Sequence, residues 1–125
     1  MAEYPGDIVR TYLRLMEARD LDAAAGYLAD DVEIVFPGGR TFSSLDEQVA
    51  SSAGRFRGVT KTFDRVDVVE TDDDAAVVYA FGTLAGRNLQ GTDFAGIRFI
   101  DRFTLVDGLI VDQMVWNDLA ESGVL

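Results

Sequence analysis

The run at residues 95–106 reads AGIRFIDRFTLV, and one residue in it breaks the pattern of the others. Alternate residues of a β-strand face the same side. One face of this strand therefore carries Ile97, Phe99, Asp101, Phe103 and Leu105. All but Asp101 are large and apolar, which predicts the inner face of a sheet. A carboxylate there costs several kcal/mol unless it is paired, hydrogen-bonded or protonated, so we interpret Asp101 as facing a pocket.

The composition limits the chemistry of such a pocket. With 125 residues the chain is expected to form one domain, residues 1–125, that buries roughly two-thirds of its unfolded surface. It contains neither Cys nor His, which removes thiol chemistry, the commonest general base near neutral pH and the commonest metal ligand. We expect no metal and no cofactor. Proton transfer would fall to Asp, Glu, Tyr or Lys61, the only lysine.

Charge argues against two classes of partner. The chain has 22 acidic and 11 basic residues, a formal charge of −11, which repels phosphate backbones and anionic lipid headgroups. Nucleic acid and membranes are therefore not expected partners. The first seven residues lack the basic and apolar regions of a signal peptide, and no apolar run approaches membrane-spanning length. The expected location is the cytoplasm.

Periodicity predicts helices before strands. Apolar residues at helical spacing favour helices over residues 5–19, 20–29 and 44–56, the last beginning at a capping-box sequence, Ser44-Leu45-Asp46-Glu47. A short strand is expected over 32–36, closed by Pro37-Gly38-Gly39. Longer strands follow over 59–70, 75–86, 95–106 and 109–117, the last two joined by the hairpin signal Asp107-Gly108. This order predicts an α+β fold with helices on one face of a curved sheet.

The whole chain resembles the NTF2-like superfamily, in particular its SnoaL-like and ketosteroid-isomerase-like branch. The matching features are IVRTYLRLMEARDLD at 8–22, LADDVEI at 28–34, IDRF at 100–103 and GLIVDQMVWND at 108–118. The resemblance implies a cone-shaped α+β barrel, in which three N-terminal helices pack on a curved, mostly antiparallel sheet. It also implies a homodimer through the outer sheet face and a ligand cavity at the open end. No single reaction is implied, because the fold hosts many.

The resemblance also suggests site residues. In ketosteroid isomerases a helix-one tyrosine and a strand aspartate hold the developing oxyanion, and those positions match Tyr12 and Asp101, our expected catalytic pair. By the same analogy, one face of the last strand points inward and carries Leu109, Val111, Gln113, Val115 and Asn117. The expected ligand-binding residues are Gln113, Asn117, Phe36, Phe99, Phe103 and Val115. Together they describe a mostly apolar chamber with a few polar groups, typical of sites for small hydrophobic molecules.

The usual reactions of these relatives each lack a residue here. The position of the proton-shuttling aspartate of the isomerases is Phe36. The positions of the histidine and aspartate of SnoaL-like cyclases are Gln113 and Val115. The arginine that epoxide-hydrolase-like relatives place two residues before the strand aspartate is replaced by Phe99, and the His–Asp pair of dehydratase relatives cannot form without His.

Three hypotheses follow. The first is an enzyme, or a degenerate enzyme, of the isomerase, cyclase or hydrolase type without the usual base. It would act on an apolar carbonyl or cyclic compound, with Asp101 as acid or hydrogen-bond donor beside Tyr12. The second is a ligand-binding protein without turnover, and the third is an NTF2-type protein-interaction module, against which the inward carboxylate argues.

Purely structural roles stay open for three of these residues. Asp101 could be satisfied by a backbone amide, a Tyr hydroxyl or an Arg. Tyr12 could be a core aromatic, and Trp116 could lie at a dimer interface or in the core.

Overall fold

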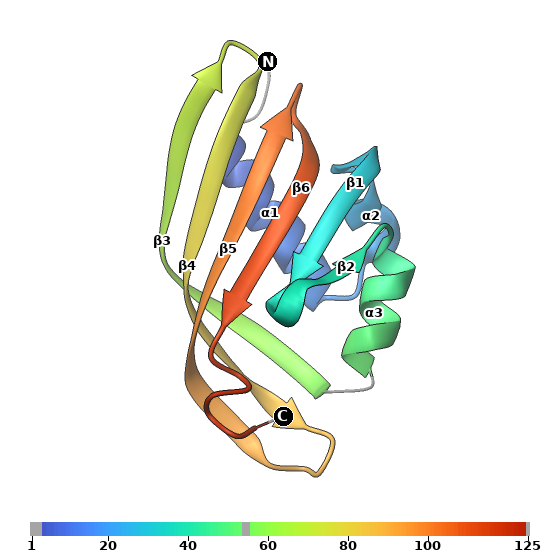
Figure 1. The fold of residues 1–125 in the computed structure, drawn as a ribbon, viewed down its shortest axis with the longest axis vertical. Coiled ribbons are helices and arrows are strands. Elements are labelled where there is room, and N and C mark those ends of the chain that lie inside the picture. The colour runs from blue at the N-terminus through green and yellow to red at the C-terminus, as the bar shows by residue number, and fades with distance from the viewer. Residues whose placement is uncertain (1–3, 54–55, 125) are drawn as a thin grey trace.

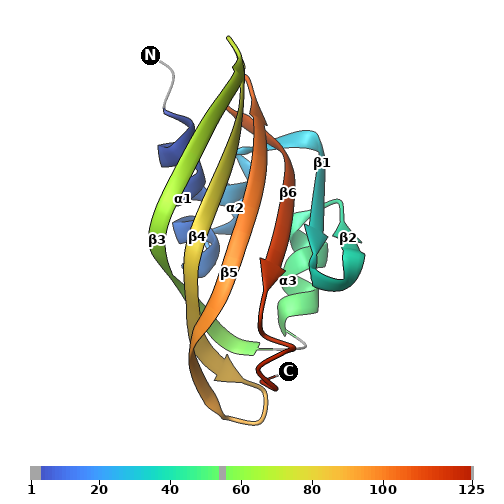
Figure 2. The same cartoon turned by 60° about the vertical axis from the view of Figure 1, so that its left-hand side comes forward.

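The computed structural model describes residues 4–53 and 56–124, shown as ribbons in Figures 1 and 2. Within these residues the chain forms three α-helices, one 3-10 turn and six strands. In chain order they are α1 Pro5–Glu17, α2 Leu21–Ala25, β1 Leu28–Phe36, η1 Pro37–Gly39, β2 Arg40–Phe42, α3 Leu45–Ala53, β3 Phe56–Asp72, β4 Ala75–Asn88, β5 Asp93–Val106 and β6 Leu109–Asn117.

All six strands belong to one sheet in the order β2-β1-β6-β5-β4-β3. Every neighbouring pair is antiparallel except β1 and β6, which run parallel. The sheet curves around α1 and the other helices lie on the same side (Figures 1 and 2). The predicted α+β class, the three helices and the mostly antiparallel sheet are confirmed, and the sheet remains open rather than closing into a complete barrel.

Helix α1 lies against the concave face because its apolar residues share one side. Ile8, Val9, Tyr12, Leu13 and Met16 are all buried, as the spacing predicts for an amphipathic helix. Pro5 occupies the first turn, where its fixed φ suits the helix and its missing N–H would have no partner. In the described part of the chain, no helix has both the length and the apolar content needed to cross a membrane.

The predicted alternation holds along β5 but only along part of β6. Gln113 and Val115 are buried as expected, whereas Ile110 is buried and Leu109 is exposed, the reverse of the prediction. The register of β5 with β6 shifts between Thr104 and Leu105. One extra residue in a strand exchanges its two faces, and the period-two pattern alone did not reveal that irregularity.

Several helix and strand boundaries differ from the prediction: α1 ends at Glu17 rather than Arg19, and β1 begins at Leu28 rather than Val32. Helix α2 ends at Ala25, not near residue 29, because Leu28 already pairs with Ile110 in the parallel β1–β6 ladder. The short strand β2 was not predicted. It returns antiparallel to β1 after the turn at Pro37–Gly39. The third helix ends at Ala53; of the remaining residues in the expected helix, 54–55 lie outside the described residues and Phe56 begins strand β3.

The capping-box prediction for α3 is confirmed at its first bond. The Glu47 backbone N donates to Ser44 Oγ at 3.2 Å. The Glu47 side chain reaches back one residue further than the usual box, accepting from the Ser43 backbone N at 3.1 Å. The start of α3 is therefore fixed by local sequence.

A glycine allows β3 to bend across the inner face of β4. A Cβ at Gly82 would lie 1.9 Å from the Thr62 carbonyl oxygen and 3.0 Å from the Phe99 ring. Only a residue without a side chain permits this close backbone approach. The approach carries the first half of β3 over the sheet, and with it Lys61, which is paired in register with Leu84.

Candidate functional site

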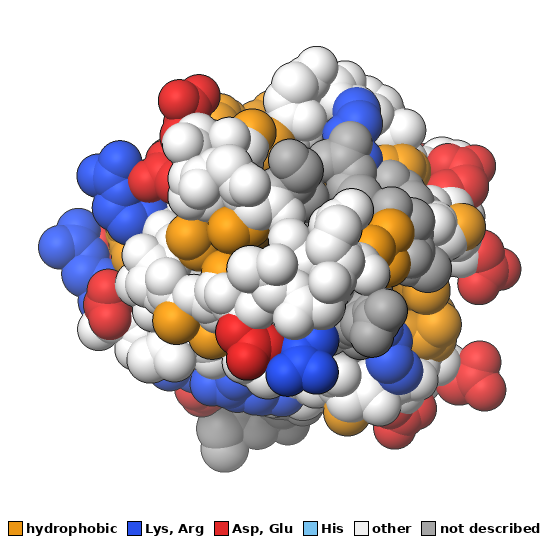
Figure 3. Space-filling view, turned by 90° about the horizontal axis from the view of Figure 1, so that it is seen from below, with side chains coloured by type: hydrophobic (Ala, Val, Ile, Leu, Met, Phe, Trp, Pro, Cys, Tyr) orange, Lys and Arg blue, Asp and Glu red, His pale blue; other side chains and the backbone are white. Residues whose placement is uncertain are grey.

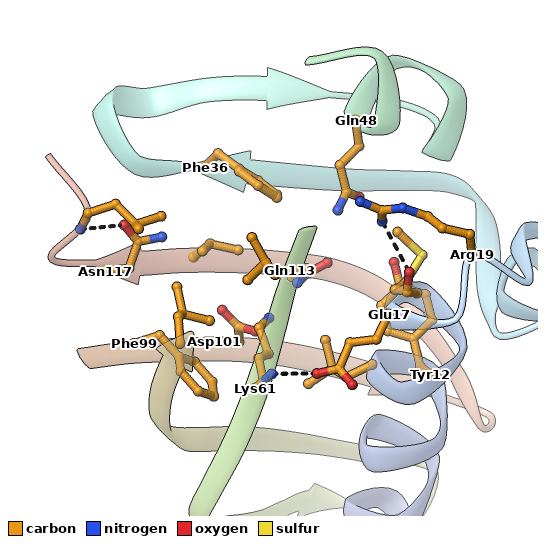
Figure 4. Close-up of a pocket in the computed structure, with 16 residues that line it drawn as sticks. Tyr12, Glu17, Arg19, Phe36, Gln48, Lys61, Phe99, Asp101, Gln113 and Asn117 are labelled. Carbon is orange, nitrogen blue, oxygen red and sulfur yellow. Dashed lines mark hydrogen bonds and ion pairs between the residues drawn. The ribbon is translucent and has the colours of Figure 1, made fainter. Parts of the chain in front are cut away.

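A cavity of about 120 Å³ lies between the C-terminal half of α1, the first half of β3 and the inner sheet face (Figure 4). Its polar wall includes Tyr12, Gln48, Lys61, Asp101, Gln113 and Asn117, and its apolar wall includes Leu13, Met16, Phe36, Leu84, Phe99 and Val115. The cavity sits at the end of the molecule where α1, β1 and β6 all finish. Seen from that end, hydrophobic side chains are exposed between acidic and basic ones (Figure 3).

The structure brings the predicted site residues together with one exception. Tyr12, Phe36, Phe99, Asp101, Gln113, Val115 and Asn117 all line the cavity. Phe103, expected among the ligand-binding residues, is not on its wall. It is fully buried behind Tyr12, with the two ring centroids 6.1 Å apart and the rings nearly perpendicular. The alternation correctly placed Phe103 inward, but an inward residue that far along β5 meets the helix instead of the cavity.

Asp101 is completely buried and its partner is a lysine. Lys61 Nζ donates a hydrogen bond to Asp101 Oδ2 at 2.6 Å, and the exposed fractions of the two side chains are 18% and 0%. The three partners considered from sequence were a backbone amide, a tyrosine hydroxyl and an arginine, and none of these is the group found. In this pair Asp101 accepts a hydrogen bond at Oδ2, and its role as an acid or hydrogen-bond donor stays a prediction.

Two side chains of helix α1 hold the backbone of Lys61 in place. The Lys61 backbone N donates to Glu17 Oε1 at 2.6 Å, and Arg14 Nη1 donates to the Lys61 carbonyl oxygen at 2.9 Å. Arg14 Nη1 also donates to Glu17 Oε2 at 2.9 Å. The ammonium itself lies 5.0 Å from the Phe99 ring centroid, within cation–π range. Hydrogen bonds to α1 thus hold the backbone of Lys61, and Asp101 and the Phe99 ring hold its ammonium.

Four buried polar atoms around the cavity make no hydrogen bond to any described residue: Tyr12 Oη, Gln48 Oε1, Asp101 Oδ1 and Gln113 Oε1. An unsatisfied buried polar group costs about 1–3 kcal/mol, and such groups are few in a folded protein. Their concentration in one place is typical of a site that exchanges hydrogen bonds with a small molecule.

Tyr12 is held as a neutral phenol. Burial raises the pKa of Tyr12 well above its ordinary value, and the nearby Asp101 carboxylate raises it further. Since both effects disfavour the phenolate, Tyr12 is a hydrogen-bond donor at neutral pH and not a base.

Arg19 and Asn117 complete the rim of the cavity. Arg19 follows α1 with a positive φ of 59°, a conformation usually taken by glycine or asparagine at a helix end. Its Nη1 donates to the Met16 carbonyl oxygen at 3.1 Å, which turns the guanidinium back over the helix end. Asn117 Oδ1 accepts a hydrogen bond from the Leu119 backbone N at 3.2 Å. Figure 4 shows Arg19 beside Gln48 on the side away from Asn117.

Lys61 was recognised from sequence only as a titratable residue and was not placed in the site. The signal was present, because Val59, Lys61 and Phe63 alternate on one face of the predicted strand. Val59 lines the cavity beside Lys61. The charge that interrupts an apolar face is the feature that singled out Asp101, and applied to β3 it would have found its partner.

A larger hollow of about 680 Å³ lies at the opposite end, beside the β3–β4 turn and Asp72, Asp73 and Asp74. Its acidic side chains are exposed to solvent. Unlike the smaller cavity, it has no buried charged group among the described residues that line it.

A family model described as the SnoaL-like domain matches residues 9–113 of the chain. No curated protein gives a significant match.

Solved structures share the fold at low sequence identity. An NTF2-like protein of unknown function from Burkholderia pseudomallei is 20% identical, with a TM-score of 0.78 over 96% of this chain and 95% of that one. A proposed polyketide cyclase from Pseudomonas putida is 17% identical, with a TM-score of 0.71 over 97% and 96%. The hexachlorocyclohexane dehydrochlorinase LinA-type3 from Novosphingobium barchaimii is 14% identical, with a TM-score of 0.80 over 90% and 82%. At these identities the likeness shows the fold alone.

Proposed function

Since the chain belongs to the SnoaL-like domain family, we propose that its internal cavity binds a small, mostly apolar carbonyl or cyclic compound. The observation that carries this proposal is the fully buried Asp101, paired with Lys61 on the wall of an otherwise largely apolar cavity. A purely structural core has no need of a buried ion pair, which apolar residues of similar volume replace at little cost.

The size and lining of the cavity support a small ligand with one ring. A volume of about 120 Å³ is below the range of drug-sized sites and suits a single ring whose substituents extend through the mouth. Phe36 and Phe99 offer apolar surface for such a ring. Tyr12, Gln48 and Gln113 offer hydrogen-bonding groups that the protein leaves unused.

Two proteins of the same fold have names that state an activity on small molecules. One is the proposed polyketide cyclase and the other the hexachlorocyclohexane dehydrochlorinase. Their names support a small-molecule role for this chain over a protein-interaction role.

Binding and turnover are separated by one pair of assays. Binding of cyclic ketones, enones and epoxides is followed by calorimetry, and their conversion by chromatography. If the parent protein converts the compounds and Asp101→Asn no longer binds them, the protein is an acid–base enzyme of the isomerase, cyclase or hydrolase type. The same binding without conversion assigns a ligand-binding protein. Asp101→Asn that changes stability but leaves binding intact contradicts the pocket proposal.

We also propose that a second copy of the chain docks on the outer face of the sheet. Ile100 and Trp116 are directly paired in register there, and Trp116 is 51% exposed. Tyr79 and Phe81 stack on the same face, with ring centroids 6.4 Å apart. Exposed aromatic groups of this kind are enriched in protein interfaces. Sedimentation of the parent and of Trp116→Lys tests this: a dimer that becomes a monomer supports it, and a monomeric parent overturns it.

A further inference from the structure

We propose that Lys61, and not Asp101, is the residue that contacts the ligand, and that it recognises a hydrogen-bond-accepting oxygen: an enolate, a phenolate or a carbonyl oxygen. This inference rests on the proposed function and names the chemical feature that the cavity selects. Asp101 then serves as a positioning residue that holds the ammonium in place.

The two members of the pair differ in access to the cavity. The Asp101 side chain is fully buried, and its Oδ2 already accepts a hydrogen bond from Lys61 Nζ. The Lys61 side chain keeps 18% of its surface exposed. Of the two side chains, only that of Lys61 has exposed surface for a ligand to contact.

The ammonium has unused donors. A lysine carries three N–H groups, and among the described residues Nζ donates to Asp101 alone. The nearby Glu17 carboxylate does not compete, because its two oxygens accept from the Lys61 backbone N and from Arg14. The remaining N–H groups of Lys61 are thus free to bind an oxygen atom of a ligand.

The charges around the cavity favour an electron-rich oxygen. Asp101 and Glu17 are the acidic residues of the wall, and Lys61 and Arg19 are the basic ones. Arg14 adds a further positive charge directly against Glu17. The wall itself is therefore balanced in charge, in a chain whose formal charge is −11, and the half-exposed Arg14 outside the wall supplies the additional positive charge. Tyr12, kept neutral, adds a donor rather than a second anion.

Para-nitrophenol and para-nitroanisole form a matched pair of probes. They have nearly the same size, but only the phenol ionises, and its absorbance reports the fraction of phenolate. In complex with the parent protein we expect the ionisation of the phenol to shift by about one pH unit toward phenolate. That is a tenfold preference, the size of one hydrogen bond to a charged group.

Four variants test the source of that preference. Lys61→Gln removes the cation, and the double variant Lys61→Met with Asp101→Asn removes both charges, so that no unpaired buried charge remains to unfold the protein. Both should lose the preference for phenolate over the anisole. Lys61→Arg should retain part of it. Arg98→Gln, which removes a positive charge from the outer face, should retain all of it.

Each outcome decides the matter. Loss of the preference in the Lys61 variants, with retention in Arg98→Gln, supports the inference. A preference unchanged in the Lys61 variants, or absent from a parent that binds both probes, overturns the inference and leaves the proposed function intact. If neither probe binds the parent, the proposed function fails and the inference fails with it.

Discussion

Two ion pairs of strand β5 have the same length and opposite surroundings. On the inner face, Lys61 Nζ lies 2.6 Å from Asp101 Oδ2, with 18% and 0% of the side chains exposed. On the outer face, Arg98 Nε lies 2.6 Å from Asp118 Oδ2, with 82% and 36% exposed. The distance is equal, so any difference in what the pairs do must come from solvent.

Solvent changes the cost of removing one partner. At the outer pair, water and salt screen the charges, and either partner left alone is simply hydrated. At the inner pair, a partner left alone is a buried charge without compensation. The inner pair is therefore a fragile arrangement that a protein keeps for a use, whereas the outer pair is an ordinary feature of a charged surface.

The largest expected effect is on stability when the inner pair is broken. Lys61→Met should lower the free energy of unfolding by about 3–5 kcal/mol, because the fully buried Asp101 loses its partner. Denaturant titration at neutral pH measures it. The charge-neutral double variant Lys61→Met with Asp101→Asn should recover at least half of the loss. A double variant as unstable as the single one would contradict the electrostatic explanation and point to packing.

A second variant tests the bend that brings β3 over β4. Gly82→Ala should cost about 1–3 kcal/mol or more, because the new Cβ would meet the Thr62 carbonyl oxygen at 1.9 Å. The control is Gly58→Ala on β3, where a Cβ would meet no atom within 4 Å. If the two variants were equally stable, the close approach at Gly82 would not be needed for β3 to place Lys61 on the cavity wall.

Tyr12→Phe removes a buried polar atom that, unlike Asp101 Oδ2, has no partner in the described part of the chain, and so compares an unsatisfied buried group with the paired one. At neutral pH the variant should be as stable as the parent, or up to about 1 kcal/mol more stable, because Tyr12 Oη has no partner among the described residues. Binding of a carbonyl ligand should nevertheless weaken. A large loss of stability would mean that the hydroxyl is already satisfied.

The same variant gives a pH dependence. The pKa of Tyr12 is raised above the ordinary value of 10.0 in the folded protein. Below that value the group is protonated in both states and contributes no slope. Above it the unfolded chain ionises first, so parental stability should fall as pH rises further. In Tyr12→Phe that part of the decline should disappear, as measured by denaturant titration across alkaline pH.

The smallest effect is expected at the outer pair. Arg98→Ala should leave the denaturation midpoint unchanged within error, in low and high salt, because both partners of the pair keep contact with water. A clear, salt-sensitive loss of stability would show that the outer face is covered in solution, and it would favour the proposed dimer surface.

The fold could be predicted from the sequence because it depends on local patterns that recur along the chain. The alternation along β5 needed only the period of a strand, and the bounds of β6 matched the hairpin signal at Asp107-Gly108. What failed depended on distant pairing. The exchanged faces of Leu109 and Ile110 come from an irregular register with β5, and the early end of α2 comes from its parallel partner β6.

The site was predictable residue by residue but not as an arrangement. Asp101, Tyr12 and Gln113 were found because each lies on a face predicted to be inward. The pairing of Asp101 with Lys61 joins residues 40 positions apart. It depends on the bend of β3, which the absence of a side chain at Gly82 on β4 permits. No local pattern specifies that approach, so the sequence did not predict Lys61 as the partner of Asp101.

The central claim is that Lys61 is held by Asp101 at the wall of a ligand cavity, and one measurement tests it directly. Because the chain contains a single lysine, protein grown with isotope-labelled lysine gives one side-chain ammonium signal in nuclear magnetic resonance. We predict slow exchange of its protons with water, a change of shift in Asp101→Asn, and a further change when para-nitrophenol is added. An ammonium that exchanges at the rate of free lysine and responds to neither change would contradict the account.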